Sequence, residues 1–168
     1  MRNRELAGLP TKQQPSQDTV GGILETYAAR GVFKGFSKTG DGSWRMLWHR
    51  NRYFDLKQTD GKLTLPEVLP QVPARSQMMK ELRAFVQSFS ADSVPEHKRI
   101  DAKKLRLRVI AKGGSAGIEA SLADDEDWDY TIRKLIHVVH EIYLVFLYDG
   151  AYYDYLIETF DLDPDHMA

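Results

Sequence analysis

Two histidines and a glutamate lie within five residues of each other in the C-terminal third of the sequence, a composition that suits metal binding or acid–base catalysis. They are His137, His140 and Glu141, in the order His-Val-Val-His-Glu. Metalloproteases use His-Glu-x-x-His or the inverted His-x-x-Glu-His, and this sequence matches neither. Helical spacing turns His137 away from the apolar stripe and puts His140 at its border. We therefore expect no metal, no cofactor and no catalytic residue here, only an exposed His137–Glu141 pair.

A second group of polar residues lies in the segment "PEHKRID", residues 95–101. His97 and Asp101 have the residue types of a general-base pair, and loops carry function more often than cores do. This loop predicts binding of an anion or a partner, with a small-molecule or anion-binding enzyme as one alternative function. The candidate binding residues, including cations of the following strand, are His97, Lys98, Arg99, Lys104, Arg106 and Arg108.

The segment 44–57 contains both basic and aromatic residues, and the aromatic residues are Trp44, Trp48, Tyr53 and Phe54. Proteins that bind single-stranded nucleic acid stack bases on aromatic rings and place cations along the phosphates. The two tryptophans share a strand face with Met46, however, which favours a core position. The RNP1 signature of RNA-recognition motifs is also missing. Nucleic-acid binding through a basic aromatic sheet face is therefore an alternative function, not the favoured one.

Acidic and glycine-rich segments suggest cation or phosphate sites at first sight. The cluster at 124–129 has no glycine at the position an EF-hand requires, and we predict that it caps a helix. The aspartates at 161, 163 and 165 receive the same interpretation. "TGDGS" and "KGGSAG" do not match phosphate-binding loops, and they lie between predicted strands. We predict that both are hairpin turns.

The periodicity of apolar residues predicts a polar N-terminal arm over residues 1–17 and a single domain over residues 18–168. A helix is expected at 19–30, followed by three strands in "VFKGFSK", "SWRMLWHR" and "RYFDLKQ". Residues 59–73 contain three prolines, so we expect an irregular connection there rather than a central strand. A helix follows, with one apolar face formed by Met78, Met79, Leu82, Phe85, Val86 and Phe89.

Strict alternation in "KKLRLRVIAK" predicts a strand, and "IEASL" predicts its hairpin partner. Helices are expected at 126–148 and 151–160. The order α-βββ-α-ββ-α-α indicates a two-layer α+β domain, with an antiparallel sheet of about five strands and helices packed on one face. In element order it resembles the fold of bacterial type III secretion chaperones, which implies a chaperone-like or adaptor-like function.

The long predicted helix carries apolar residues on more than one side, so more than one surface must cover it. Val138, Leu144 and Val145 lie off its main stripe. A tyrosine-rich segment follows, and tyrosine combines apolar area with a hydroxyl group that suits interfaces. We therefore predict a homodimer whose interface includes Val138, Leu144, Val145 and Tyr152.

Charge is strongly segregated along the chain, although the formal net charge of its 168 residues is only −1. The segments 30–57 and 98–112 are basic, whereas the region from residue 119 onward is acidic. Such asymmetry bears on partners and association rather than on fold. The chain has no cysteine, and no apolar run approaches the roughly 20 residues that span a bilayer. The sequence predicts a cytoplasmic, non-enzymatic protein-interaction domain.

Overall fold

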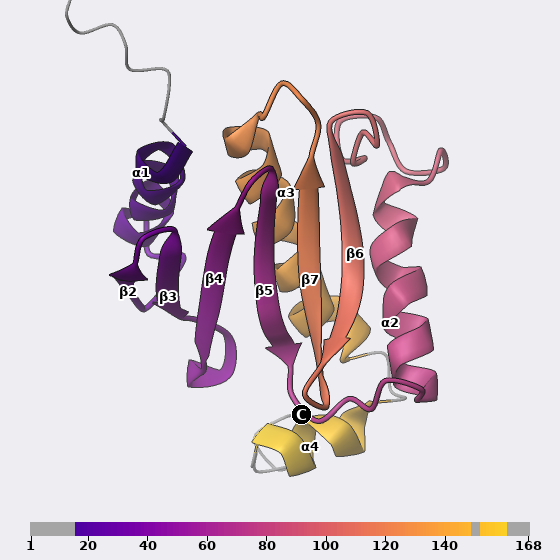
Figure 1. Cartoon of the computed structure of the whole chain (residues 1–168). Helices are drawn as coiled ribbons and strands as arrows, with labels where there is room; N and C mark the ends of the chain where they lie inside the picture. The colour runs from indigo at the N-terminus through magenta and orange to yellow at the C-terminus, as the bar shows by residue number, and fades with distance from the viewer. Residues whose placement is uncertain (1–15, 149–151, 161–168) are drawn as a thin grey trace, which may run out of the picture.

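The computed structural model describes residues 16–148 and 152–160, which form an α+β domain as predicted. Six strands make one antiparallel sheet in the order β2-β3-β4-β5-β7-β6 (Figure 1). The strands are β2 (Gly35–Gly40), β3 (Ser43–Leu47), β4 (Tyr53–Thr59), β5 (Lys62–Leu69), β6 (Leu105–Lys112) and β7 (Ser115–Leu122). The helices are α1 (Ser16–Ala29), α2 (Gln77–Gln87), α3 (Trp128–Glu141) and α4 (Tyr153–Phe160), and a π-helical turn, η4 (Ile142–Phe146), continues α3.

Strand alternation divides the sheet into a buried face and an exposed face. Trp44, Met46, Phe54 and Leu56 of the first strands point into the core, and so do Leu105, Leu107 and Val109 of β6. Figure 1 shows α3 running behind the sheet, with α2 beside β6 at one edge. α1 packs against α3, so the core lies between these helices and the sheet. No helix among residues 16–148 and 152–160 has the length and apolarity needed to cross a membrane.

Strand β5 corrects the prediction that residues 59–73 form an irregular connection. It lies in the middle of the sheet, between β4 and β7, although it contains Pro66. Its pairing with β4 ends at Thr64, and its register with β7 shifts between Leu65 and Leu69. Pro66 has no backbone N–H to donate. It therefore lies where the ladder of backbone hydrogen bonds is interrupted and no N–H is required. On β7, Gly117 faces this point, where a Cβ atom would lie 2.4 Å from the carbonyl oxygen of Leu65.

Polar caps fix the starts of the two helices that matter for the site. The Ser76 side chain accepts a hydrogen bond from the backbone N–H of Met79 and caps α2, at 3.1 Å. Asp127 caps α3 by accepting from the N–H of Tyr130 at 3.0 Å. Asp127 also pairs with Lys104, just before β6, at 2.9 Å. The predicted capping function of the acidic cluster is thus confirmed at Asp127, and this cap ties α3 to the sheet.

Candidate functional site

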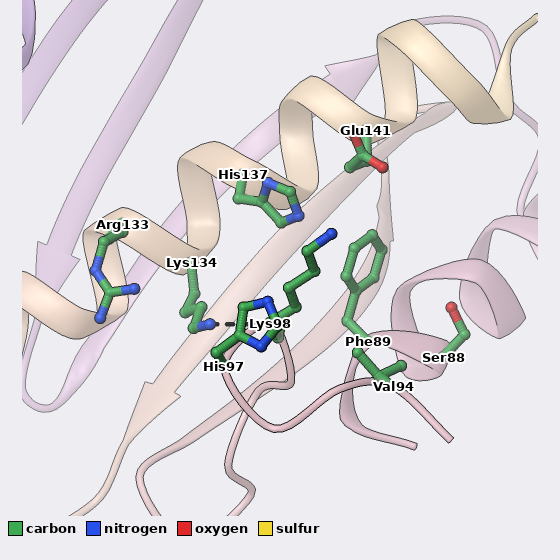
Figure 2. Close-up of a pocket in the computed structure, with 9 residues that line it drawn as sticks. All are labelled: Ser88, Phe89, Val94, His97, Lys98, Arg133, Lys134, His137 and Glu141. Carbon is green, nitrogen blue, oxygen red and sulfur yellow. Dashed lines mark hydrogen bonds between the residues drawn. The ribbon is translucent and has the colours of Figure 1, made fainter. Parts of the chain in front are cut away.

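A hollow of about 480 Å³ lies between the loop that precedes β6 and the exposed side of α3 (Figure 2). Its lining residues are Ser88, Phe89, Val94, His97, Lys98, Arg133, Lys134, His137 and Glu141. Figure 2 shows His97 and Lys98 on the loop side facing Lys134 and His137 on α3. The fold therefore brings together the loop pair and the helix pair, which are at least 36 residues apart in the sequence. Neither pair, taken from the sequence alone, predicts that the other lies next to it.

The loop that carries His97 and Lys98 is held in place from within. The Arg99 guanidinium donates to the carbonyl oxygens of Val94, at 3.1 Å, and Asp92, at 3.2 Å. The backbone N–H of Ile100 donates to the carbonyl oxygen of Phe89 at 2.8 Å, and the Ile100 side chain is buried. Arg99, predicted as a binding residue, thus braces the loop and is not among the residues that line the hollow.

Lys134 is the unusual residue of the hollow, because its side chain is buried at 5% exposure. Its ammonium group donates to the carbonyl oxygen of Lys98 at 3.4 Å and lies 5.4 Å from the centre of the Tyr130 ring. Burial, followed by the nearby charge of Arg133, lowers the pKa of Lys134 from its ordinary value. Within the described part of the chain, no carboxylate oxygen lies within 4 Å of the charged groups of Lys98, Arg133 or Lys134. The hollow is therefore positively charged at its floor.

The general-base pair suggested for His97 and Asp101 does not form. One carboxylate oxygen of Asp101 accepts the backbone N–H of Lys103 at 2.9 Å, which closes a local turn. The backbone N–H of Asp101 donates to the Tyr130 hydroxyl, also at 2.9 Å. Asp101 therefore organises the loop and its attachment to α3, while His97 lines the hollow.

The remaining cations predicted as binding residues lie elsewhere. Lys104 pairs with Asp127, and the hydrogen bond between them raises the pKa of Lys104 and lowers that of Asp127. Arg108 pairs with Glu119 across the exposed face of the sheet at 2.8 Å. Arg106 is exposed on the same face. Of the six predicted residues, only His97 and Lys98 therefore contribute to the hollow.

The two helix histidines have different surroundings. His137 is exposed and meets the edge of Phe89, with ring centres 5.7 Å apart. His140 is partly buried, and its Nδ1 lies 2.9 Å from Nε2 of His49, so one of the two nitrogens donates and the other accepts. The ring of His49 stacks flat on Tyr143 at 4.5 Å. No group of three or more metal-ligating side chains occurs among the residues that the structure describes.

Burial is the main cause of a lowered pKa at both members of the His49–His140 pair. Burial, the neighbouring His140 and Arg50 lower the pKa of His49 to about 4. The pKa of His140 is lowered in the same direction, first by burial and then by His137. The pair is therefore neutral at neutral pH. Sequence analysis missed it, because 91 residues separate its members and nothing local links them.

A second polar cluster, also missed by sequence analysis, fills the gap where β4 and β5 separate. Arg52 donates to a Glu67 carboxylate oxygen at 2.6 Å and to the Tyr143 hydroxyl at 3.0 Å. The Tyr143 hydroxyl in turn donates to the carbonyl oxygen of Val68, beyond the end of the β4–β5 ladder, at 2.5 Å. Ser115 donates to the other oxygen of Glu67 at 3.2 Å. These hydrogen bonds give the Val68 carbonyl oxygen of β5 a partner at a point where β4 supplies none.

The predicted dimer-interface residues separate into buried and exposed groups. Val138 has 0% exposure and belongs to the chain's own core, so its prediction as an interface residue is wrong. Leu144 and Val145 are exposed, at 60% and 48%. Tyr152 stacks on Phe146 at 4.9 Å and donates its hydroxyl to Glu81. Of the four predicted interface residues, Leu144 and Val145 are the two whose side chains are exposed.

Three of the four aromatic residues of the basic strands are too deeply buried to stack nucleic-acid bases. Trp44, Trp48 and Phe54 are buried in the core, as the shared face with Met46 predicts. Tyr53 alone of the four is exposed, and the Arg45 guanidinium lies 5.6 Å from the centre of its ring. The aspartates at 161, 163 and 165 lie outside the described residues.

Comparison of the chain with protein-family models, with curated proteins and with solved structures finds no match. The fold and the surfaces described above are therefore the basis for a functional proposal.

Proposed function

We propose that this chain is a non-catalytic protein-interaction domain, chaperone-like or adaptor-like, that acts as a homodimer. The observation that carries the proposal is the apolar patch formed by Leu144, Val145 and Tyr148, all of which are exposed. Helical spacing puts these residues on one side of η4 and the turn after it. Exposed large apolar side chains grouped in this way are typical of interaction surfaces.

The geometry of the patch supports a contact surface. η4 is a π-helical turn, and such turns occur frequently at functional sites. Arg50 donates to the Tyr148 hydroxyl at 2.6 Å, so a cation borders the apolar residues. Apolar residues with tyrosine and arginine at the border match the usual composition of protein interfaces.

A charge placed on the patch tests the proposal. Leu144→Glu should separate the dimer, because a carboxylate buried at an apolar interface costs several kcal/mol. Sedimentation velocity at micromolar and high micromolar concentration measures the association. Ala102→Glu is the matched control, because Ala102 is exposed and lies just before β6.

The control variant should associate as the wild-type chain does. A wild-type chain that sediments as a monomer at high micromolar concentration would contradict the homodimer. A Leu144→Glu variant that still dimerises would show that the interface lies on another surface.

A further inference from the structure

We propose that the hollow between the pre-β6 loop and α3 binds a small organic phosphate, with Lys134 as the residue at its floor. This proposal is independent of the homodimer, because it rests on a different set of side chains. The binding step requires only contacts between the ligand's phosphate oxygens and the cations that the hollow already holds.

Charge balance favours a doubly negative ligand. Lys98, Arg133 and Lys134 are the basic side chains that line the hollow, and Glu141 is the only carboxylate among its lining residues. His97 and His137 supply ring nitrogens that donate when protonated. A phosphate monoester carries a charge of about −1.5 to −2 at pH 7 and offers three acceptor oxygens. Such a group neutralises the excess charge and accepts hydrogen bonds from several sides at once.

The buried ammonium of Lys134 is the strongest sign of a ligand. A buried charge is costly unless it is paired and hydrogen-bonded. Here the only hydrogen bond of the ammonium among the described residues is a 3.4 Å contact with the carbonyl oxygen of Lys98. Its other neighbour is the Tyr130 ring, 5.4 Å away, so the ammonium, which has three donors, has remaining capacity to bind phosphate oxygens.

The size and walls of the hollow favour an organic phosphate over the inorganic ion. A volume of about 480 Å³ falls within the range of small-molecule pockets, roughly 300–1,000 Å³. Phe89 and Val94 form an apolar wall, and Figure 2 shows the Phe89 ring facing the Lys98 side chain. Glu141 lies at the far end of the hollow from Arg133 in the same view, where it is placed to accept a hydrogen bond from a hydroxyl or amino group.

The loop is preorganised for this function. Arg99 and the Tyr130 hydroxyl hold its backbone, and His97 and Lys98 lie between these two attachments. A rigid loop loses little conformational freedom on binding, so more of the interaction energy contributes to affinity.

The experiment uses phenyl phosphate as the probe, because it combines a phosphate with an aromatic ring. Isothermal titration calorimetry on the full chain measures its affinity, with phenol and inorganic phosphate as the two partial probes. Phenyl phosphate should bind more tightly than either. Lys134→Met should weaken its binding by about 10- to 100-fold, the effect expected for losing one charge-assisted hydrogen bond.

Two further variants keep the test decisive. Lys98→Met changes an exposed side chain of the hollow, so it should fold normally and also weaken binding. Lys38→Met, on the opposite edge strand β2, is the matched control and should bind as the wild type does. Lys134→Met should also melt at the same temperature as the wild type or above it, because it removes the cost of a buried charge.

Three results would overturn the proposal. One is undetectable binding of phenyl phosphate at about 10 mM, beyond the weakest range of specific recognition. Another is unchanged binding in Lys134→Met and in Lys98→Met. A third is a large loss of melting temperature in Lys134→Met together with unchanged binding in Lys98→Met, which would assign Lys134 to the structure of the loop.

Discussion

At the scale of single residues, the His49–His140 pair makes the fold sensitive to acid. An unfolded histidine binds a proton below about pH 6.5, whereas burial and its neighbours hold the pKa of His49 at about 4 in the folded chain. Between these values the unfolded state binds more protons, so the free energy of unfolding falls as the pH falls from about 6.5 to 4. His140 acts in the same direction.

The predicted decrease in the free energy of unfolding that is due to His49 is at most about 3 kcal/mol between about pH 7 and pH 4. Urea titrations at pH 7, 6, 5 and 4.5 measure it. His49→Phe keeps an aromatic ring stacked on Tyr143 and should flatten the pH dependence. His97→Phe, in the exposed loop, controls for the loss of one histidine. Equal pH dependence in wild type and His49→Phe would refute this account.

Residue types and spacing predicted some of these local environments and missed others. The shared strand face correctly predicts that Trp44 and Trp48 lie in the core with Met46. The His-Val-Val-His-Glu spacing predicts an exposed His137 and a border position for His140, and both are observed. The predicted His137–Glu141 pair does not form in the described part of the chain, where the His137 ring instead meets Phe89. The partner of His140 is on the β3–β4 connection, and only the assembled fold brings the two rings together. A local sequence pattern cannot predict a contact between residues that are so far apart in the chain.

At the scale of secondary-structure elements, the cluster around Arg52 replaces the missing part of the β4–β5 ladder. Arg52→Met should lower the free energy of unfolding by about 2–4 kcal/mol, because it leaves Glu67 without its cation and weakens the bonding at Val68. Only 18% of the Arg52 side chain is exposed, so solvent does not replace these bonds fully. Chemical denaturation monitored by tryptophan fluorescence measures the change.

Arg45→Met provides the matched control. Arg45 also pairs with a carboxylate, Asp55, at 2.7 Å, but both side chains are about half exposed. Exposed pairs contribute little to stability, so this variant should unfold at nearly the same denaturant concentration as the wild type. An Arg52→Met variant as stable as Arg45→Met would show that the cluster does not support the sheet.

Element prediction succeeded where periodicity was unbroken and failed at one interrupted strand. Alternation correctly predicts β6, the hairpin turn correctly predicts that β7 follows it, and the apolar face of the segment 78–89 correctly predicts α2. The prolines of residues 59–73 argue against a central strand, yet β5 is central. The reason is that Pro66 coincides with the end of one ladder and the register shift of the other. The sequence shows where the prolines are. It does not show that the end of the β4–β5 ladder and the register shift against β7 fall at the same place, because that depends on how the strands pair.

At the scale of the whole molecule, the exposed face of the sheet carries much of its own counter-charge. Part of this counter-charge comes from the acidic region that begins at residue 119. Glu119, the first residue of that region, lies on β7 and contacts Arg108 at 2.8 Å and Lys62 at 3.8 Å. Asp55 on β4 pairs with Arg45 in the same way. These pairs lower the positive potential that a polyanion would meet.

Binding of single-stranded DNA should therefore be weak and independent of sequence, with a dissociation constant of about 1–100 µM at about 150 mM salt. It should weaken further as salt is added, because released counterions dominate such binding. Fluorescence anisotropy with a labelled oligonucleotide measures it. Replacing both Arg106 and Arg108 with Glu should abolish the residual signal, and replacing the exposed Arg75 and Arg83 with Glu controls for the same change in net charge. Submicromolar binding that only the first pair of substitutions removes would contradict this prediction and make the sheet a nucleic-acid-binding surface.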